Sequence, residues 1–508
     1  MSAMLWTLLI SQTVGVVVDE AVRQRLATSG EVDAMLRLGI PLDLESLDVA
    51  GTRASRREAV YQHLVRQASE SQKGVRATLE RVGATFTPFW IVNAIAVRKL
   101  SAPVLQSLVE VHANELSSVE LIGGRWRHKP VETIFSAVWP PASPHWNIDL
   151  ISAAKAWPEA NGSGIVVATL DGGVSFTHEA LVESYRGNVG GGKFVHDFNW
   201  RDWAYKRSSP EDDDGHGTNV QGIATAAHGY GVAPGAQWFT GKIFNFAGYS
   251  ADDWTLAGCQ FAMCPTCGSW NRAKGLRNLT IAPCASFTHR VSGLTPSGRP
   301  VDADLPENCS LGADVISNSW GETNATSDFL KPVVAAWLKA GIVPVFAVGN
   351  AGPECATSVS PSDYDGVLAV GATDKHDEIC VFSSRGPAAN GTTGPIPYSS
   401  LAPSIVAPGL SIAGPSYTDD RSYTDFSGTS QAAPHVAGAA AILLSANPHL
   451  SPSEVASLLY NHANTSTLQE PDQGKEKCGG EEWSSFPNYI YGYGRLDVYA
   501  ALKGLHAM

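Results

Sequence analysis

The sequence predicts an α/β fold, a doubly wound parallel sheet with helices on both faces, preceded by a small α+β domain. From residue 150 onward the composition shifts to Gly, Ala and Val, and apolar runs of strand length alternate with helical stretches. Continuous apolar runs joined by helical crossovers are typical of a parallel sheet that is buried on both faces. Residues 20–122 are instead rich in charge and contain no cysteine. We therefore expect two folding units of different class.

The larger unit, residues 150–508, is expected to contain six strands and five helices. The strands are expected at 164–170, 238–244, 313–317, 342–348, 367–371 and 405–407. The helices are expected at 216–227, 252–263, 328–340, 430–446 and 453–462. The stretch 432–446 is apolar on all sides, which predicts a central and fully buried helix. Residues 276–313 have no clear period, and we interpret residues 264–312 as a cysteine-containing insertion.

The smaller unit, residues 20–122, reads as helix, strand, helix and strand. These elements are expected at 52–82, 90–97, 102–111 and 119–122. Residues 123–149 then combine a basic cluster with several prolines, a composition typical of an exposed linker. We expect a processing site in this linker.

Composition narrows the class of protein. The chain has 508 residues and a formal net charge of −13 without any basic block, which argues against a nucleic-acid partner. The longest early apolar run, 4–18, is too short to span a bilayer. It has the length of a signal-peptide core, although no Lys or Arg precedes it. We expect a signal peptide within residues 1–19, and a misassigned start or a buried helix is the alternative.

Cysteines and glycosylation triplets favour an extracellular protein. The chain has eight cysteines, an even number, and six Asn-x-Ser/Thr triplets, at Asn161, Asn278, Asn308, Asn324, Asn390 and Asn464. In a secreted protein such triplets are glycan acceptors on surface loops.

Four cysteines lie close together in the chain, at Cys259, Cys264, Cys267 and Cys284. Cys264 and Cys267 have the spacing of half a zinc site, but disulfides that close the insertion are the interpretation we favour for a secreted chain. We also expect Cys355 to pair with Cys380, because the two flank the strand at 367–371.

Four polar residues are expected at one edge of the larger sheet. Asp171 follows the strand 164–170, and Asn350 follows 342–348 after one glycine. His216 and Ser430 each open a predicted helix. In open parallel sheets, functional groups gather beyond the carboxyl ends of the strands. We therefore expect these side chains to meet.

Their chemical types fit acyl transfer. A serine hydroxyl is a poor nucleophile until a base takes its proton, and His216 can be that base for Ser430. Asp171 can orient the imidazole, and Asn350 can donate to an oxyanion beside the Ser430 backbone N–H. Taken singly, each residue is more often a turn or cap residue. Together, in the chain order Asp, His, Ser that subtilisin shows, they favour catalysis.

The surrounding motifs carry a resemblance to a known family. They are Val167-Ala-Thr-Leu-Asp-Gly-Gly-Val174, Asp212-Asp-Asp-Gly-His-Gly-Thr-Asn-Val-Gln-Gly222, Ile316-Ser-Asn-Ser-Trp-Gly321, Phe346-Ala-Val-Gly-Asn350 and Ser427-Gly-Thr-Ser-Gln-Ala-Ala-Pro-His-Val-Ala-Gly438. With these, residues 146–501 resemble the subtilisin-like serine peptidases (subtilases). Within that family the chain is similar to bacillopeptidase F-like enzymes, on the segments His178–Leu181, Tyr185–Gly187 and Cys259–Phe261.

The resemblance implies a secreted endopeptidase that is made as a zymogen and acts on proteins or peptides. Residues 40–122 resemble the family's inhibitory propeptide, which packs on the protease and is cut away. Two segments are expected to pair with an extended substrate, or to be plain core and turn: Ser319, Trp320 and Gly321 in one, Ala347 and Gly349 in the other. No cofactor and no catalytic metal is required, and the chain is expected to be a monomer.

Three positions depart from the family pattern. Asn219 stands where a second histidine is usual, Gly172 where threonine is usual, and Gln431 where methionine is usual. None removes a catalytic atom. The acidic run Asp212–Asp214 could bind a structural calcium ion, attract basic substrate residues, or be a solvated loop.

Two other functions are compatible with these motifs. One is a catalytically silent subtilase fold used for binding, which the complete set of catalytic residues argues against. The other is a sedolisin-type acid peptidase, which the Gly-His-Gly-Thr segment around His216 disfavours.

Overall fold

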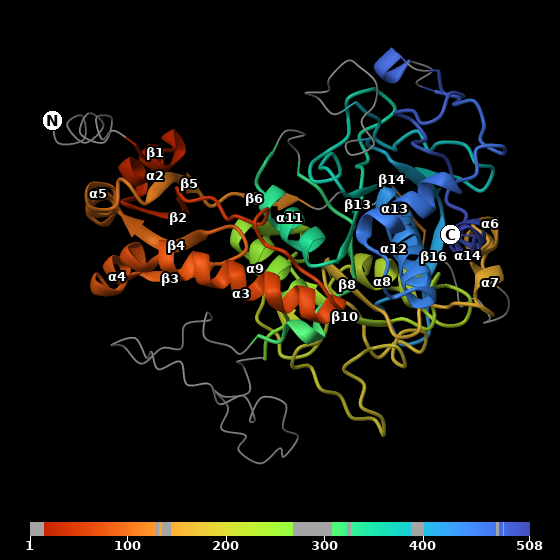
Figure 1. Cartoon of the computed structure of the whole chain (residues 1–508), viewed down its shortest axis with the longest axis horizontal. Helices are drawn as coiled ribbons and strands as arrows, with labels where there is room; N and C mark the ends of the chain where they lie inside the picture. The colour runs from red at the N-terminus through yellow and green to blue at the C-terminus, as the bar shows by residue number, and fades with distance from the viewer. Residues whose placement is uncertain are drawn as a thin grey trace.

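The structure, a computed structural model, describes residues 15–126, 132–134, 144–267, 307–322, 327–387, 401–473, 477–480 and 482–507. A five-stranded sheet with its helices forms an N-terminal domain at one end of the molecule (Figure 1). A seven-stranded sheet forms the core of the larger domain that follows. In the part of the chain that is described, no helix combines the length and apolarity needed to cross a membrane.

The N-terminal sheet has the order β1-β5-β2-β4-β3. Its strands are β1 (Val17–Val18), β2 (Glu31–Leu38), β3 (Thr85–Phe89), β4 (Ala94–Ser101) and β5 (Leu116–Leu121). Its helices are α2 (Glu20–Ser29), α3 (Arg53–Ser71), α4 (Lys73–Arg81) and α5 (Ala102–Val111). β1 pairs parallel with β5, and Val16 and Val18 are buried in the core of this domain. The folded domain therefore begins before residue 20.

The larger sheet is parallel throughout and has the order β15-β14-β13-β12-β8-β10-β9. Its strands are β8 (Val166–Asp171), β9 (Trp200–Asp202), β10 (Gln237–Lys242), β12 (Val315–Asn318), β13 (Val343–Ala347), β14 (Leu368–Thr373) and β15 (Ile405–Pro408). This is the predicted doubly wound sheet, with β9 added at one edge. All residues of β12 to β15 are buried, as expected of strands covered on both sides.

Helices cover both faces of this sheet. One face packs against α7 (Ala153–Ala156), α8 (His216–Thr225), α12 (Thr429–Ala446), α13 (Pro452–Asn461) and α14 (Val498–His506). The other face packs against α9 (Asp252–Met263) and α11 (Lys331–Lys339). Helix α12 is buried from Thr429 to Leu444, which confirms the predicted central helix. Short elements complete the domain: α6 (Trp146–Leu150), η3 (Cys309–Leu311), η4 (Cys478–Gly480), β11 (Tyr249–Ala251), β16 (Ile412–Pro415) and β17 (Tyr423–Ser427).

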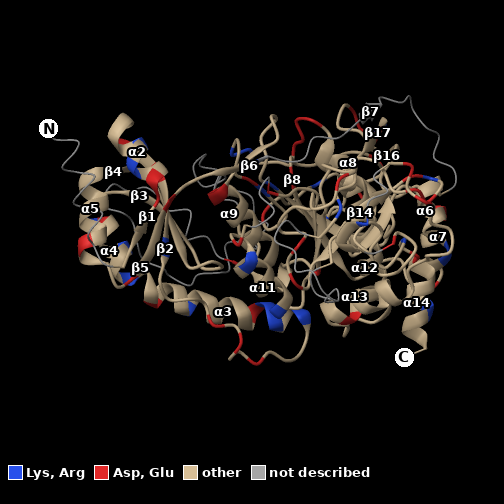
Figure 2. Ribbon diagram, turned by 90° about the horizontal axis from the view of Figure 1, so that it is seen from above, with Lys and Arg blue, Asp and Glu red and all other residues tan. Residues whose placement is uncertain are grey.

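One apolar cluster contains residues of both domains. Val60 and Leu64 of α3, together with Trp90, lie in the same buried cluster as residues of α9 and α11. Figure 2 shows α3 running beside α11. Trp90–Asn93 is the turn of the β3–β4 hairpin, so the strand predicted at 90–97 was wrong in its first half. The turn is apolar because it is buried against the larger domain.

The predicted linker is paired with the larger domain wherever it is described. β6 (Gly124–Trp126) pairs antiparallel with β11, and β7 (Glu132–Ile134) pairs antiparallel with β17. Arg125 is only 6% exposed, and Asn147 of α6 is fully buried. The exposed connection that the prolines and charges predicted is not seen in these segments. Residues 127–131 and 135–143 of the linker lie outside the described residues.

The disulfides differ in part from the expected ones. Cys264 bonds to Cys309, which closes the base of the insertion, and Cys267 is also disulfide-bonded. Cys355 bonds to Cys478 and not to Cys380, so that predicted pair was wrong. Cys380 and Cys259 are buried free thiols. Residues 268–306 of the insertion and residues 1–14 of the predicted signal peptide lie outside the described part of the chain.

Candidate active site

Asp171 and His216 form a buried hydrogen-bonded pair. Asp171 is the last residue of β8, and its two carboxylate oxygens lie 2.9 and 3.0 Å from His216 Nδ1. Their exposed fractions are 1% and 0%. Because Nδ1 faces a carboxylate, the neutral ring carries its proton there and leaves the Nε2 lone pair open. In the described residues Nε2 has no hydrogen-bond partner, so its lone pair is available to accept a proton.

Glycines allow this close approach at the start of α8. Gly215 caps the helix at φ +85°, a left-handed conformation that glycine adopts without strain. A Cβ on Gly217 would lie 2.1 Å from the Gly173 carbonyl oxygen and 3.2 Å from Asp171 Cβ. Any larger residue at Gly217 would therefore push the helix away from the Asp171 loop.

Ser430 is the second residue of α12 and is fully buried. Its hydroxyl donates to the Ser319 carbonyl at 3.2 Å, and the Ser319 hydroxyl donates back to the Ser430 carbonyl at 2.7 Å. No hydrogen bond joins Ser430 to His216 in the described part of the chain. In this structure the Ser430 hydroxyl is thus engaged by the Ser319 carbonyl.

The first turns of α8 and α12 are tied together by two of the residues that depart from the family pattern. Gln431 Nε2 donates to Asn219 Oδ1 at 3.2 Å, and Asn219 Nδ2 donates to the Thr424 carbonyl at 3.1 Å. One bond thus links the residue after Ser430 to the residue three after His216. Gly172, the third residue that departs from the family pattern, is also hydrogen-bonded. Its backbone N–H donates to Asp171 Oδ1 at 2.6 Å.

Asn350 presents its amide nitrogen to the same site. Its Oδ1 accepts hydrogen bonds from the Thr429 backbone N–H at 2.9 Å and from the Thr429 hydroxyl at 2.8 Å. A backbone N–H must face an oxygen, so Nδ2 points the other way, and it is buried without a partner in the described residues. A Cβ on Gly428 would lie 3.2 Å from it. Thr429 was not predicted as a site residue, although its place beside Ser430 was a signal for it.

The expected substrate-lining residues surround this site in different ways. Ser319 contacts Ser430 directly, and Gly321 lies two residues further on, outside any helix or strand. The Trp320 ring is fully buried, and its Nε1 donates to the Leu170 carbonyl at 2.8 Å. Ala347 and Gly349 are likewise buried. Trp320 and Ala347 thus present no exposed surface in this structure.

The acidic run before His216 has partners within the protein. Asp212 accepts hydrogen bonds from the Thr218 backbone and hydroxyl, at 2.9 and 2.6 Å, which caps the first turn of α8. Burial, followed by the neighbouring Asp214 carboxylate, raises the pKa of Asp212 to about 6. Asp213 pairs with Arg207 at 2.6 Å and with Lys242 at 2.8 Å. The run is therefore no solvated loop.

Within the described residues, no group of three or more His, Cys, Asp or Glu side chains is arranged to hold a metal ion. The calcium site considered from the acidic run has no support in this geometry. His435 of α12 is fully buried between Asn147 Nδ2 and the Gln431 carbonyl, both at 2.8 Å, and burial lowers its pKa to about 4.

Comparison with known proteins agrees with this geometry. Residues 162–494 match the family described as "Subtilase family". The chain is 30% identical to bacillopeptidase F of Bacillus subtilis (strain 168) over 487 residues, which are 91% of this chain and 30% of the relative. It is 29% identical to subtilisin DY of Bacillus licheniformis over 325 residues, 63% of this chain and 90% of the relative.

The chain thus spans less than a third of the length of bacillopeptidase F. The family match covers well over half of this chain and includes Asp171, His216, Asn350 and Ser430. The parallel sheet, the buried carboxylate–imidazole pair and the helix-borne serine lie in the matched region. This chain belongs to the subtilase family of serine peptidases.

Proposed function

We propose that the chain is a secreted serine endopeptidase, made as a zymogen, that hydrolyses peptide bonds of proteins. The observation that carries the proposal is the buried pair of Asp171 and His216, whose Nε2 is left open beside the helix that bears Ser430. Ser430 Oγ attacks the scissile carbonyl while His216 Nε2 takes the hydroxyl proton. Asp171 stabilises the imidazolium that forms.

The rest of the reaction follows from the same groups. Asn350 Nδ2 and the Ser430 backbone N–H donate to the oxyanion of the tetrahedral intermediate. His216 then gives its proton to the leaving amine, and water repeats the sequence to release the acyl group. The open Asn350 Nδ2 atom, held by Thr429, supports this assignment.

Replacement of the nucleophile tests the assignment. Ser430→Ala should reduce turnover of casein by roughly 10⁶-fold, a magnitude known for subtilisin and adopted from it. A fluorophosphonate should label Ser430 in the wild type and label it far more slowly after His216→Ala. Retained casein hydrolysis by Ser430→Ala would refute the assignment.

The zymogen proposal rests on two short strands of the linker, β6 and β7, which lie before and after residues 127–131. β6 pairs with β11, and β7 pairs with β17, which ends at Ser427, three residues before Ser430. We propose that the N-terminal domain inhibits the enzyme until the chain cuts itself between Trp126 and Glu132, within the 123–149 segment.

N-terminal sequencing of the secreted protein measures the cut directly. The expected first residue of the mature enzyme lies between 127 and 132, and Ser430→Ala should leave the precursor uncut. A mature start near residue 20 would contradict the zymogen proposal.

The support for secretion comes from the disulfide bonds, because residues 1–14 of the predicted signal peptide lie outside the described part of the chain. Two structural disulfides, Cys264–Cys309 and Cys355–Cys478, are typical of proteins from oxidising compartments. Detection of the enzyme in culture medium, with both bonds intact on mass spectrometry, is the expected result.

A further inference from the structure

Arg125 lies in the segment before the proposed cut. Its side chain occupies an acidic pocket on the larger domain, which we call the peptidase domain. Its side chain is 6% exposed. Nη1 donates to Asp252 Oδ1, and Nη2 donates to Glu322 Oε1 at 3.2 Å. The guanidinium carbon lies 4.0 Å from the centre of the Phe329 ring. The pocket thus offers two carboxylates and an aromatic face, the three features that suit a planar guanidinium.

The pocket belongs to the peptidase domain and is adjacent to the substrate-lining segments. Asp252 opens α9 directly after β11, and Glu322 follows Gly321. Their side chains are 15% and 11% exposed with Arg125 in place. In the described residues, the hydrogen bonds and ion pairs of both carboxylates come only from Gly123 and Arg125. Release of the N-terminal segment therefore removes the guanidinium that these two carboxylates share.

Strand pairing determines which substrate position reaches this pocket. β6 lies antiparallel to β11, with Arg125 opposite Ser250 and Trp126 opposite Tyr249. Backbone pairing of this kind accepts any sequence, whereas the pocket beside it recognises one side chain. A peptide that replaces β6 in the same register presents its own side chain where Arg125 now lies. Because β6 precedes the proposed cut, this position is on the amino-terminal side of the scissile bond.

We propose that the mature enzyme selects substrates with an arginine upstream of the scissile bond, read by Asp252, Glu322 and Phe329. The proposal rests on the proposed peptidase function and deepens it. Lysine fits less well, because an ammonium group is a single point charge without a planar face. It cannot bind two separate carboxylates in the plane of a guanidinium while it stacks on Phe329.

The test compares quenched fluorescent peptides that copy residues 121–134, with Arg125 kept or replaced by citrulline, lysine or alanine. Citrulline has nearly the shape of arginine but no charge. The processed enzyme should cleave the arginine peptide with a kcat/KM roughly 10- to 100-fold above that of the citrulline peptide. In Asp252→Asn/Glu322→Gln this preference should disappear. The comparison of the arginine and citrulline peptides uses only the wild-type enzyme, so it tests the proposal even if the double variant folds poorly.

Asp253→Asn is the matched control. Asp253 is the neighbour of Asp252 but bonds to Arg98 and not to Arg125, so its replacement makes the same type of charge change without altering a group that binds the Arg125 guanidinium. The arginine preference should survive it. Equal cleavage of arginine and citrulline peptides, or a preference that persists in the double variant, would overturn the proposal. If no peptide is cut and Ser430 is not labelled by fluorophosphonate, the peptidase function itself fails, and the pocket proposal fails with it.

Discussion

At the scale of single residues, Lys242 is the least expected group near the active site. It ends β10 with a fully buried side chain. Its ammonium pairs with Asp213 at 2.8 Å and donates to the Gly172 carbonyl, in the turn that follows Asp171. A buried cation is tolerated only when such partners surround it. Lys242, on the neighbouring strand β10, thus helps to hold the backbone of the turn at Gly172, where the glycine itself is flexible.

We predict that Lys242→Met lowers the free energy of unfolding by roughly 1–3 kcal/mol, because the buried Gly172 carbonyl loses its donor and Asp213 keeps only Arg207 as an ion-pair partner among the described residues. The rate of Ser430 labelling by fluorophosphonate should fall as the Asp171 turn relaxes. Lys331→Met is the control, since Lys331 forms an exposed pair with Asp328 worth below about 1 kcal/mol. Equal urea midpoints for the two variants would contradict this view of Lys242.

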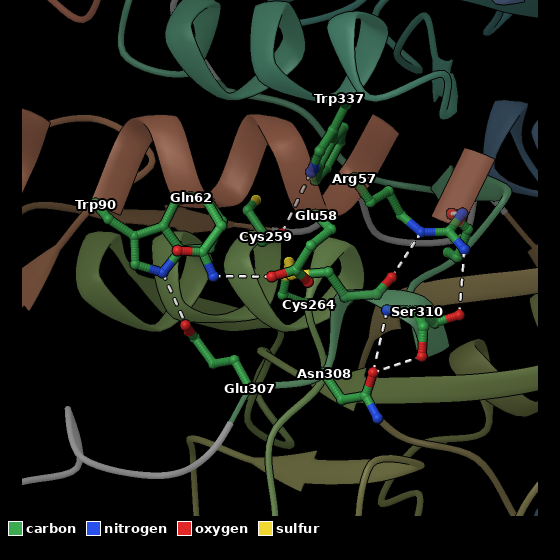
Figure 3. The surroundings of a disulfide bond; sticks show 12 residues. Arg57, Glu58, Gln62, Trp90, Cys259, Cys264, Glu307, Asn308, Ser310 and Trp337 are labelled. Atoms are coloured by element: carbon green, nitrogen blue, oxygen red, sulfur yellow. Dashed lines mark hydrogen bonds between the residues drawn. A yellow bond between two sulfur atoms is a disulfide. The ribbon is translucent and has the colours of Figure 1, made fainter. Parts of the chain in front are cut away.

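At the scale of elements, helix α3 anchors the N-terminal domain through arginine. Arg57 is 4% exposed and donates to the carbonyls of Cys309 and Ala313, at 2.9 and 3.0 Å. It also pairs with Asp314 at 3.0 Å. Figure 3 shows Arg57 reaching from α3 toward the Ser310 segment, close to the Cys264 disulfide. The disulfide therefore holds in place the backbone carbonyls that this helix recognises.

Arg57→Gln should weaken the docking of the N-terminal domain by roughly 3 kcal/mol, because two buried carbonyls lose a charged donor. In a Ser430→Ala background, trypsin should then cut between the domains much faster. Arg66→Gln provides the matched control, since Arg66 is exposed on the same helix and its hydrogen bond among the described residues joins it to His63 of its own domain. Identical cutting rates for both variants would rule out an anchoring role of Arg57.

At the scale of the whole molecule, the contact between the domains contains a titrating group. Glu307 accepts hydrogen bonds from Trp90, at 3.1 Å, and from Tyr61, both in the N-terminal domain. Burial raises the pKa of Glu307 from 4.5 to about 7. The raised pKa means that the protonated acid favours docking. The resulting stability is full below about pH 4.5 and is lost as the pH rises to about 7.

We predict that uncut Ser430→Ala precursor is more stable to urea at pH 5 than at pH 8. A pKa that moves from 4.5 to about 7 corresponds to roughly 3 kcal/mol at most. In Ser430→Ala/Glu307→Gln, the side-chain amide at position 307 can still accept a hydrogen bond from Trp90 but cannot titrate. The pH dependence of stability that Glu307 causes should therefore vanish. An unchanged pH dependence in that variant would show that other groups cause it.

The sequence predicts the larger sheet well because its strands are continuous apolar runs. It predicts α9 and α5 to the residue, since their apolar spacing and flanking residues are regular. Short edge strands such as β9 and β11 carry no such pattern. The run at 90–97 misled because apolarity can arise from contact with another domain as well as from a strand.

The candidate catalytic residues could be proposed from local motifs, whereas the groups around them could not. Lys242, Asp252, Glu322 and Phe329 lie in no motif, and only the fold brings them to their partners. The Cys355–Cys478 bond was missed for the same reason. It joins residues 123 positions apart, whose proximity sequence spacing does not reveal.

The buried thiols of Cys259 and Cys380 have a consequence for heating. Burial raises the pKa of both well above the ordinary value, which keeps them unreactive in the native protein. Once the chain opens, each can ionise and attack the Cys264–Cys309 or Cys355–Cys478 bond, exchanging one pairing for another. Scrambled chains cannot regain the native fold on cooling. We therefore expect loss of the native protein at high temperature to be irreversible, faster in alkaline buffer, and governed by the rate at which the molecule first opens.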